Sequence, residues 1–125
     1  MLEAVEQSSA LYRATLTDED GAHPALATIA SWVVSLSYPD GTAINGLDQE
    51  PLVTAGAIVD ATRFTYDEVT GVFEWRMAPG DNGLANQTRR HETHELVFEV
   101  TYGPSGSRRF NHCTAVVVRN CRKIT

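Results

Sequence analysis

Hydrophobic and polar residues alternate along three segments of this chain, residues 31–38, 72–78 and 93–102. On one side these segments carry Trp32, Val34, Leu36 and Tyr38, then Phe73, Trp75 and Met77, then His94, Leu96, Phe98, Val100 and Tyr102. A period of two sends successive side chains to opposite faces, which is typical of a strand with one buried face. We therefore predict a strand over each segment, the longest over residues 93–102.

Shorter extended runs precede, separate and follow these three strands. Weaker strands are expected at residues 11–17, 52–54, 57–59, 63–66, 108–112 and 113–119. Turn residues divide the chain at intervals of about ten residues, as in Pro39-Asp40-Gly41, and the short hairpin loop at residues 103–106 is rich in glycine. Seven or eight short strands with this spacing predict an all-β sandwich. A helical turn is expected only within residues 2–9 or 24–30.

The length of 125 residues fits one domain with one core. We assign residues 1–10 to an N-terminal arm, residues 11–119 to the sandwich and residues 120–125 to a C-terminal arm. Residues 78–90 form an irregular loop that is longer than a hairpin needs, and such loops are often functional. The predicted core between the two sheets consists of Trp32, Val34, Leu36, Phe73, Trp75, Leu96, Phe98, Val100 and Val117.

The composition argues against two classes of partner. Hydrophobic residues make up 42% of the chain and charged residues 21%, as in an ordinary globular domain. A net charge of −6 argues against nucleic acid as the main partner. No apolar run approaches the ~20 residues that a membrane span needs. The first residues lack a basic start and an apolar stretch, so we expect synthesis in the cytoplasm without a secretory signal.

Charge is distributed unevenly along the sequence. Residues 1–70 contain eleven acidic and two basic residues, whereas residues 71–125 contain eight basic and five acidic residues. Scattered, solvated surface charge is one interpretation of this asymmetry. The other is a surface with complementary patches that suit ordered assembly.

Histidine, cysteine and acidic residues offer candidate chemistry, and their spacing argues against it. His91 and His94 flank a glutamate as the histidines of a zinc protease do, but that motif has histidines four apart on a helix. On a strand, residues three apart point to opposite faces. Cys113 and Cys121 are separated by extended chain, so their Cα atoms would lie more than ~20 Å apart, too far for a disulfide. Residues 18–21 indicate a turn rather than a calcium loop. We predict two free thiols, no catalytic residue, no metal and no cofactor.

Two stretches resemble a recurrent pattern of bacteriophage proteins. Residues 12–21 match a T-L-T-D-x-x-G opening. Gly-Val-Phe-Glu-Trp at 71–75, an Asp-containing loop at 78–82 and a Phe-Glu-Val-type strand at 94–103 follow the same pattern. The chain is similar here to the immunoglobulin-like N-terminal domain of phage baseplate upper proteins and to small proteins encoded among virion genes. Over residues 11–119 the resemblance implies an immunoglobulin-like sandwich in a virion, and it carries over no catalytic residue.

We therefore expect a non-enzymatic structural protein of a bacteriophage particle, as a head decoration, neck or tail-associated subunit. Its expected partners are other virion proteins, with copies of itself as a further option, and no membrane. The alternative is a glycan- or host-surface-binding module, which exposed Trp or Tyr side chains in a groove would favour. Contacts are expected from both termini and the 78–90 loop, with these candidate residues: Asp81, Asn82, Arg89, Arg90, Arg108, Arg109, Arg119, Arg122 and Lys123.

Overall fold

The computed structural model describes residues 2–5, 10–82 and 91–119, and these residues form two packed β-sheets. The larger sheet has the order β1 (Leu2–Val5), β9 (Arg108–Arg119), β8 (His91–Tyr102), β3 (Ile29–Ser37), β4 (Glu50–Thr54), β5 (Ala57–Ile58). The smaller sheet has the order β2 (Ala10–Thr15), β7 (Val72–Met77), β6 (Phe64–Tyr66). Three single-turn 3-10 helices complete the described elements: η1 (Leu26–Thr28), η2 (Pro79–Asn82) and η3 (Pro104–Gly106).

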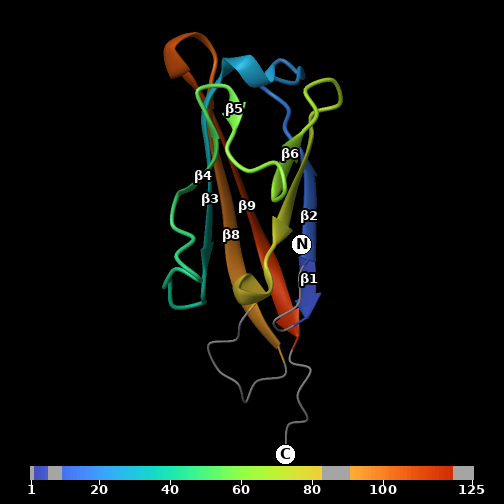
Figure 1. The fold of residues 1–125 in the computed structure, drawn as a ribbon, viewed down its shortest axis with the longest axis vertical. Coiled ribbons are helices and arrows are strands. Elements are labelled where there is room, and N and C mark those ends of the chain that lie inside the picture. Colours follow the sequence, from blue (N-terminus) through green and yellow to red (C-terminus); the bar gives the residue numbers. More distant parts are fainter. Residues whose placement is uncertain (1, 6–9, 83–90, 120–125) are drawn as a thin grey trace, which may run out of the picture.

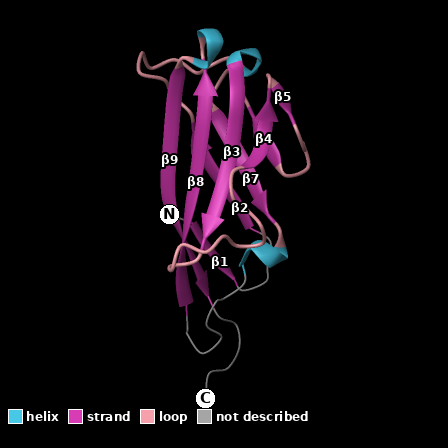
Figure 2. Ribbon diagram, turned by 90° about the vertical axis from the view of Figure 1, so that its left-hand side faces the viewer, coloured by secondary structure: helices cyan, strands magenta, loops and turns pink. Residues whose placement is uncertain are grey.

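The strand order is that of an immunoglobulin-like sandwich. β9, β8 and β3 form the central part of one sheet, which β4 and β5 extend, as in the variable-type arrangement. β2, β7 and β6 form the opposite sheet, and the first strand, β1, joins β9 in parallel. Figure 1 shows the two sheets from the side, and Figure 2 shows the larger sheet with β9 at its left-hand edge. The predicted all-β, immunoglobulin-like sandwich is therefore confirmed.

Aromatic side chains fill the centre of the core. The Trp32 ring lies 4.8 Å from the ring of Phe64 and 4.9 Å from that of Phe73, between centroids. Tyr12 stacks on Phe98 at 5.6 Å and so connects β2 to β8, the strand pair that a disulfide joins in antibody domains. Aromatic contact across the sheets replaces that covalent link here, because large rings combine a large buried area with specific packing geometry.

Eight of the nine predicted core residues are buried, and Val117 is the exception. Val116 and Val118 are buried instead, whereas Val117 is only partly covered. Residues 115–118 are all apolar, so the period of two is absent there and the sequence does not select the buried face. The register with β8 selects it: Val116 lies opposite His94, which faces the core.

The predicted ends of the chain need two corrections. Residues 2–5 are neither an arm nor a helical turn, because they form β1 and pair in parallel with residues 116–119. The expected pair of strands at 108–112 and 113–119 is one continuous strand, β9, in unbroken register with β8. The expected C-terminal arm, residues 120–125, lies outside the described residues.

Candidate functional site

The outer edge of β9 is the candidate functional site. On one side, β9 pairs with β8 along its whole length, from Arg108 to Arg119. On the other side, β1 pairs only with residues 116–119. Within the described part of the chain, the eight residues 108–115 therefore have no strand partner on that side. Figure 2 shows this edge running above β1 along the left of the large sheet.

The other sheet edges are shorter. β5 ends the large sheet with two residues, and β6 ends the small sheet with three. The remaining edge strands are β1 with four residues and β2 with six. Proteins commonly protect an edge strand by keeping it short, by placing proline in it or by bending it with a bulge. Residues 108–115 are long, contain no proline and show no shift of register against β8.

The inward-facing side chains of this edge are only half-buried. Phe110, His112 and Thr114 point toward the smaller sheet, and all three keep partial exposure. They line a seam between the edge of β9 and the edge of β2. Tyr12 of β2 crosses this seam, and its hydroxyl hydrogen-bonds to Nε2 of His112. The Phe110 and His112 rings are nearly parallel, with centroids 6.2 Å apart.

Burial sets the protonation states in the seam. It lowers the pKa of His112, because the charged imidazolium loses solvation there. Burial also raises the pKa of Tyr12. At neutral pH the histidine is therefore neutral, and its Nε2 shares a hydrogen bond with the tyrosine hydroxyl. The seam is an uncharged strip that combines aromatic surface with one polar contact.

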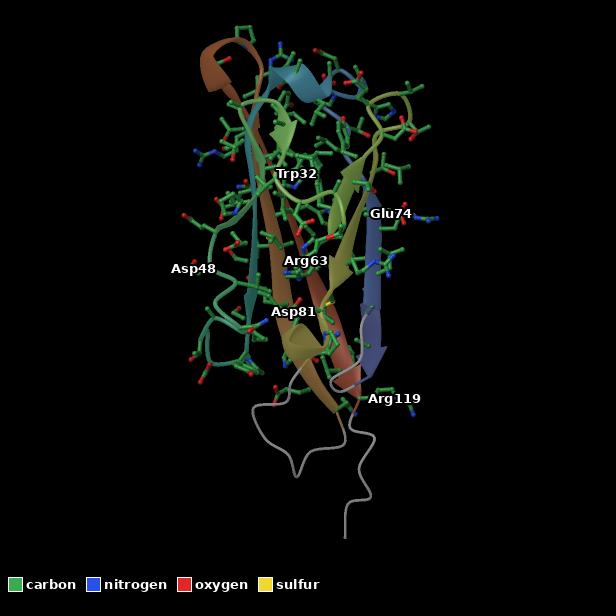
Figure 3. All side chains as sticks on the ribbon, viewed as in Figure 1. Trp32, Asp48, Arg63, Glu74, Asp81 and Arg119 are labelled. Atoms are coloured by element: carbon green, nitrogen blue, oxygen red, sulfur yellow. The ribbon has the colours of Figure 1, made fainter. Side chains whose placement is uncertain are left out.

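Arginine residues mark both ends of β9. Arg108 and Arg109 begin the strand, are exposed and belong to the open edge. The Arg108 guanidinium lies 3.6 Å from a carboxylate oxygen of Glu19 and 3.5 Å from one of Asp20. Because these ion pairs are exposed to solvent, they contribute little to the stability of the fold. Arg119 ends the strand at the opposite pole of the molecule (Figure 3). β9 contains three arginines and no acidic residue.

Asp81 and Asn82 are buried, which corrects their expected role as contact residues. The Asp81 carboxylate accepts hydrogen bonds from Nη2 of Arg63 at 2.6 Å and from Nδ2 of Asn45 at 2.9 Å. It also accepts one from the backbone N–H of Ala78 at 2.7 Å. Figure 3 shows Arg63 and Asp81 close together on the inner side of the ribbon. The Asp-containing loop therefore begins with a structural anchor, and its first residues do not form a docking surface.

The other predicted contact residues fall into two groups. Arg108, Arg109 and Arg119 lie on β9, and the structure places the first two together on the open edge. Four more lie outside the described residues: Arg89, Arg90, Arg122 and Lys123. The sequence identified the arginines, but not the edge that they share.

The histidine and cysteine positions agree with the strand geometry expected from sequence. His91 is exposed and His94 is buried, so their side chains lie on opposite faces of β8. Cys113 is an exposed free thiol, whereas Cys121 lies outside the described residues. In the described ranges, no three His, Cys, Asp or Glu side chains cluster as metal ligands would.

The described helices include none that is long and apolar enough to cross a membrane.

The sequence did not predict a buried hydrogen bond between Glu92 and His94. Both side chains face the core from β8, with Oε1 of Glu92 2.6 Å from Nε2 of His94. The period of two over residues 91–102 contained the signal, because it assigns residues 92 and 94 to the buried face.

The turn predicted at residues 18–21 is confirmed. Asp18 Oδ1 accepts hydrogen bonds from the backbone N–H groups of Asp20 and Ala22.

Comparison with known proteins supports the fold. No family model matches the sequence, and no curated protein matches it. Among solved structures, the periplasmic chaperone SfaE is similar with a TM-score of 0.55 and 8% sequence identity. The match covers 97% of this chain and 55% of that structure, so the chain spans about half the length of the chaperone. At this identity the similarity establishes a shared architecture and nothing about function.

Proposed function

We propose that this protein is a non-enzymatic structural protein of a bacteriophage particle, where it binds other virion proteins. The observation that carries the binding role is the open edge of β9 at residues 108–115. An edge strand presents a row of backbone N–H and C=O groups that can pair with a strand of another chain. The resemblance of residues 11–119 to phage immunoglobulin-like modules supports the assignment to a virion.

Rigid shape suits the sandwich to this role. Its core joins both sheets through contacts among aromatic rings, so the edge is held in place on a stable scaffold. Rigid partners lose little conformational freedom on binding, which favours affinity. In a symmetric particle, a small contact of this kind is repeated many times, and repetition converts modest affinity into high avidity.

The alternative of a glycan-binding module depends on exposed aromatic side chains. Trp32 and Trp75 are both buried. No aromatic side chain among the described residues belongs to the exposed large hydrophobic ones, which are Leu11, Val59 and Val69. Tyr38 lines a hollow of about 510 Å³ beside β8 and β9, but the Tyr38 ring packs against His94 at 5.2 Å. We therefore favour protein–protein contact over carbohydrate stacking.

Mass spectrometry of purified phage particles tests the proposal. We expect the chain in density-purified virions at a fixed ratio to the major capsid or tail protein, in amounts that survive repeated purification. Matched samples from cells infected with a mutant phage that makes no particles provide the control. If the chain stays in the soluble host fraction and is absent from purified virions, the proposal is wrong.

A further inference from the structure

We infer that the open edge of β9 pairs with the same edge of a second copy of this chain, in antiparallel orientation about a two-fold axis at Asn111. This inference rests on the proposed function and names the partner at that edge. Residues 108–115 have no strand partner on that side within the described chain. Two such edges, paired through their backbone N–H and C=O groups, would join the large sheets of both copies into one.

The position of the axis follows from strand geometry. Directly opposite residues of an antiparallel pair lie on the same face of the sheet, so a two-fold axis through the sheet passes through a residue and not between two. An axis at Asn111 pairs residues 108–114 of one copy with residues 108–114 of the other. This pairing spans about 23 Å at ~3.3 Å per residue and ends before β1 begins.

Neighbouring positions of the axis are less favourable. An axis at His112 would place Arg108 of one copy opposite Val116 of the other. Val116 already pairs with Leu2 of β1, so its edge is occupied. An axis at Phe110 avoids β1 but leaves a pairing of five residues, because β9 begins at residue 108. The axis at Asn111 therefore gives the longest pairing that β1 allows.

The inward-facing row of the edge is complementary to itself in this register. The pairing places Phe110 of each copy opposite His112 of the other. Both side chains are half-buried in a single copy, and their rings lie nearly parallel along β9, 6.2 Å apart between centroids. Each ring would cover the exposed part of the ring opposite, and aromatic pairs across strands are stabilising. Arg108 falls opposite the uncharged Thr114, so no like charges meet in this row.

The outward-facing row also brings no like charges together. Arg109 falls opposite Cys113 of the other copy, and Asn111 falls opposite its own image. Two asparagine amides are self-complementary, because each carries a hydrogen-bond donor and an acceptor. The register that β1 allows is thus also one in which both rows match.

The basic charge of the edge is balanced within each copy. Arg108 lies 3.6 Å from a carboxylate oxygen of Glu19 and 3.5 Å from one of Asp20. Arg109 shares its face of the sheet with Glu99, which lies diagonally across from it on β8. Two copies can therefore approach edge to edge without strong repulsion between their arginines. An edge with balanced charge and an uncharged seam matches an identical edge.

The expected dimer is weak. A contact of one strand from each copy is smaller than the ~800 Å² per partner of a standard stable interface, so association should depend on concentration. A particle that holds many copies close together favours such a contact. In solution, the pairing is best detected by trapping it covalently.

Disulfide trapping tests both the pairing and its register on the full chain. Cys121 is changed to serine in every variant, which leaves Cys113 as the native thiol. R109C then adds a thiol directly opposite Cys113 of the other copy, where the Cβ atoms of paired strands lie about 5 Å apart. Within one copy the two thiols lie about 13 Å apart along β9, too far for a disulfide. Mild oxidation of R109C/C121S should give a covalent dimer as the main product on a non-reducing gel.

Two variants provide the controls for trapping. C121S alone carries only Cys113, and the Cys113 residues of two paired copies would lie about 13 Å apart along the strands. R76C/C121S carries its second thiol at an exposed position on β7 of the other sheet. It measures cross-linking by random collision. Both controls should stay largely monomeric under the same oxidation.

Charge exchange tests the register without a covalent bond. C113R places an arginine opposite Arg109 at two symmetric positions and should weaken association about fivefold. R109E/C113R makes both pairs opposite in charge and should restore association at least to the wild-type level. T65R, exposed on β6 of the other sheet, is the control and should leave association unchanged. Sedimentation equilibrium of the reduced proteins gives the dissociation constants, and circular dichroism checks the fold of each variant.

Three results would overturn the inference: no more covalent dimer from R109C/C121S than from R76C/C121S, equal cross-linking of C121S, or equal association of C113R and the wild type. Purified particles separate this failure from failure of the proposed function. Presence of the wild-type chain in particles, together with any of these results, means that the chain docks through another surface. Absence of the wild-type chain from particles contradicts the proposed function, whatever the dimer measurements show.

Discussion

The core of this protein has two regions of opposite chemistry. Its centre is aromatic, with Trp32 surrounded by the rings of Phe64, Tyr66 and Phe73. The end at which β8 begins contains four buried polar side chains, two in η2 and two in β8: Asp81, Asn82, Glu92 and His94. Aromatic rings stabilise the fold through the apolar surface that they bury, and this contribution tolerates small shifts in side-chain position. Buried polar groups stabilise only when each finds its partner, so this end specifies geometry more strictly.

The two regions also differ in how far their contacts reach along the chain. Asp81 connects η2 to Arg63 near β6 and to Asn45 in the loop before β4. Glu92 and His94 are neighbours on one strand. The polar end therefore combines one long-range anchor with one local pair, whereas the aromatic centre joins both sheets. Substitutions in each region test this division.

The largest effect is expected at the aromatic centre. Trp32→Ala removes one of the two largest fully buried rings of the core and should lower the free energy of unfolding by about 3–5 kcal/mol. Urea denaturation followed by circular dichroism measures the change. Val69→Ala is the control, because Val69 is 82% exposed and should change stability by less than about 0.5 kcal/mol. A loss below about 1 kcal/mol for Trp32→Ala would contradict the assigned core.

Asp81→Ala should have the next largest effect. The substitution leaves the Arg63 guanidinium and the Asn45 amide without their acceptor, and we expect a loss of about 3 kcal/mol. Asp48→Ala is the matched control, since Asp48 is exposed and should have little effect. Differential scanning calorimetry can compare both variants with the wild type. Equal melting temperatures for the two variants would mean that Asp81 is not an anchor.

A double-mutant cycle of Glu92→Leu and His94→Phe should reveal coupling of about 1 kcal/mol. The two side chains are buried and share a hydrogen bond of 2.6 Å, so each single change removes the same interaction. The stability losses should therefore not add in the double variant. Denaturant titrations of all four proteins in the same buffer give the coupling energy. Strict additivity would show that the pair does not act as a unit.

The smallest expected effect is a pH dependence from His112 in the seam. Burial lowers its pKa below the ordinary value of 6.5, so the unfolded chain binds more protons between the two pKa values. The free energy of unfolding should therefore rise with pH through that window and fall on acidification. The slope should decrease in His112→Gln but not in His91→Gln, which alters an exposed histidine. Unfolding curves at pH 5, 6 and 7 measure it, and unchanged slopes in both variants would contradict the proposed protonation state.

Local sequence patterns predicted most of the strands. The segments near residues 31–38, 72–78 and 93–102 became β3, β7 and β8, because alternation of period two reflects a strand with one buried face. Pro39, Asp40 and Gly41 likewise formed the expected turn, with the Gly41 N–H donating to the carbonyl of Tyr38. These features depend only on residues that are close in the sequence, so the amino-acid sequence was sufficient to predict them.

Register and burial of polar groups could not be predicted in the same way. Val117 was misassigned because four consecutive apolar residues fit either face. Asp81 looked like a loop residue available for contact, and only the tertiary fold brought Arg63 and Asn45 to it. Both outcomes depend on residues at least 18 positions away in the chain, as for Arg63 and Asp81. No local pattern contains that information.

By itself, the sequence determined that this protein is an all-β sandwich with an aromatic core, through alternation, turn residues and composition. Only the tertiary structure decided which strand edge stays open. β1 pairs beside residues 116–119, and residues 108–115 of β9 therefore have no strand partner on that side within the described chain. The physical reason is that strand pairing uses backbone groups that every residue carries, so the selection comes from the packing of distant elements.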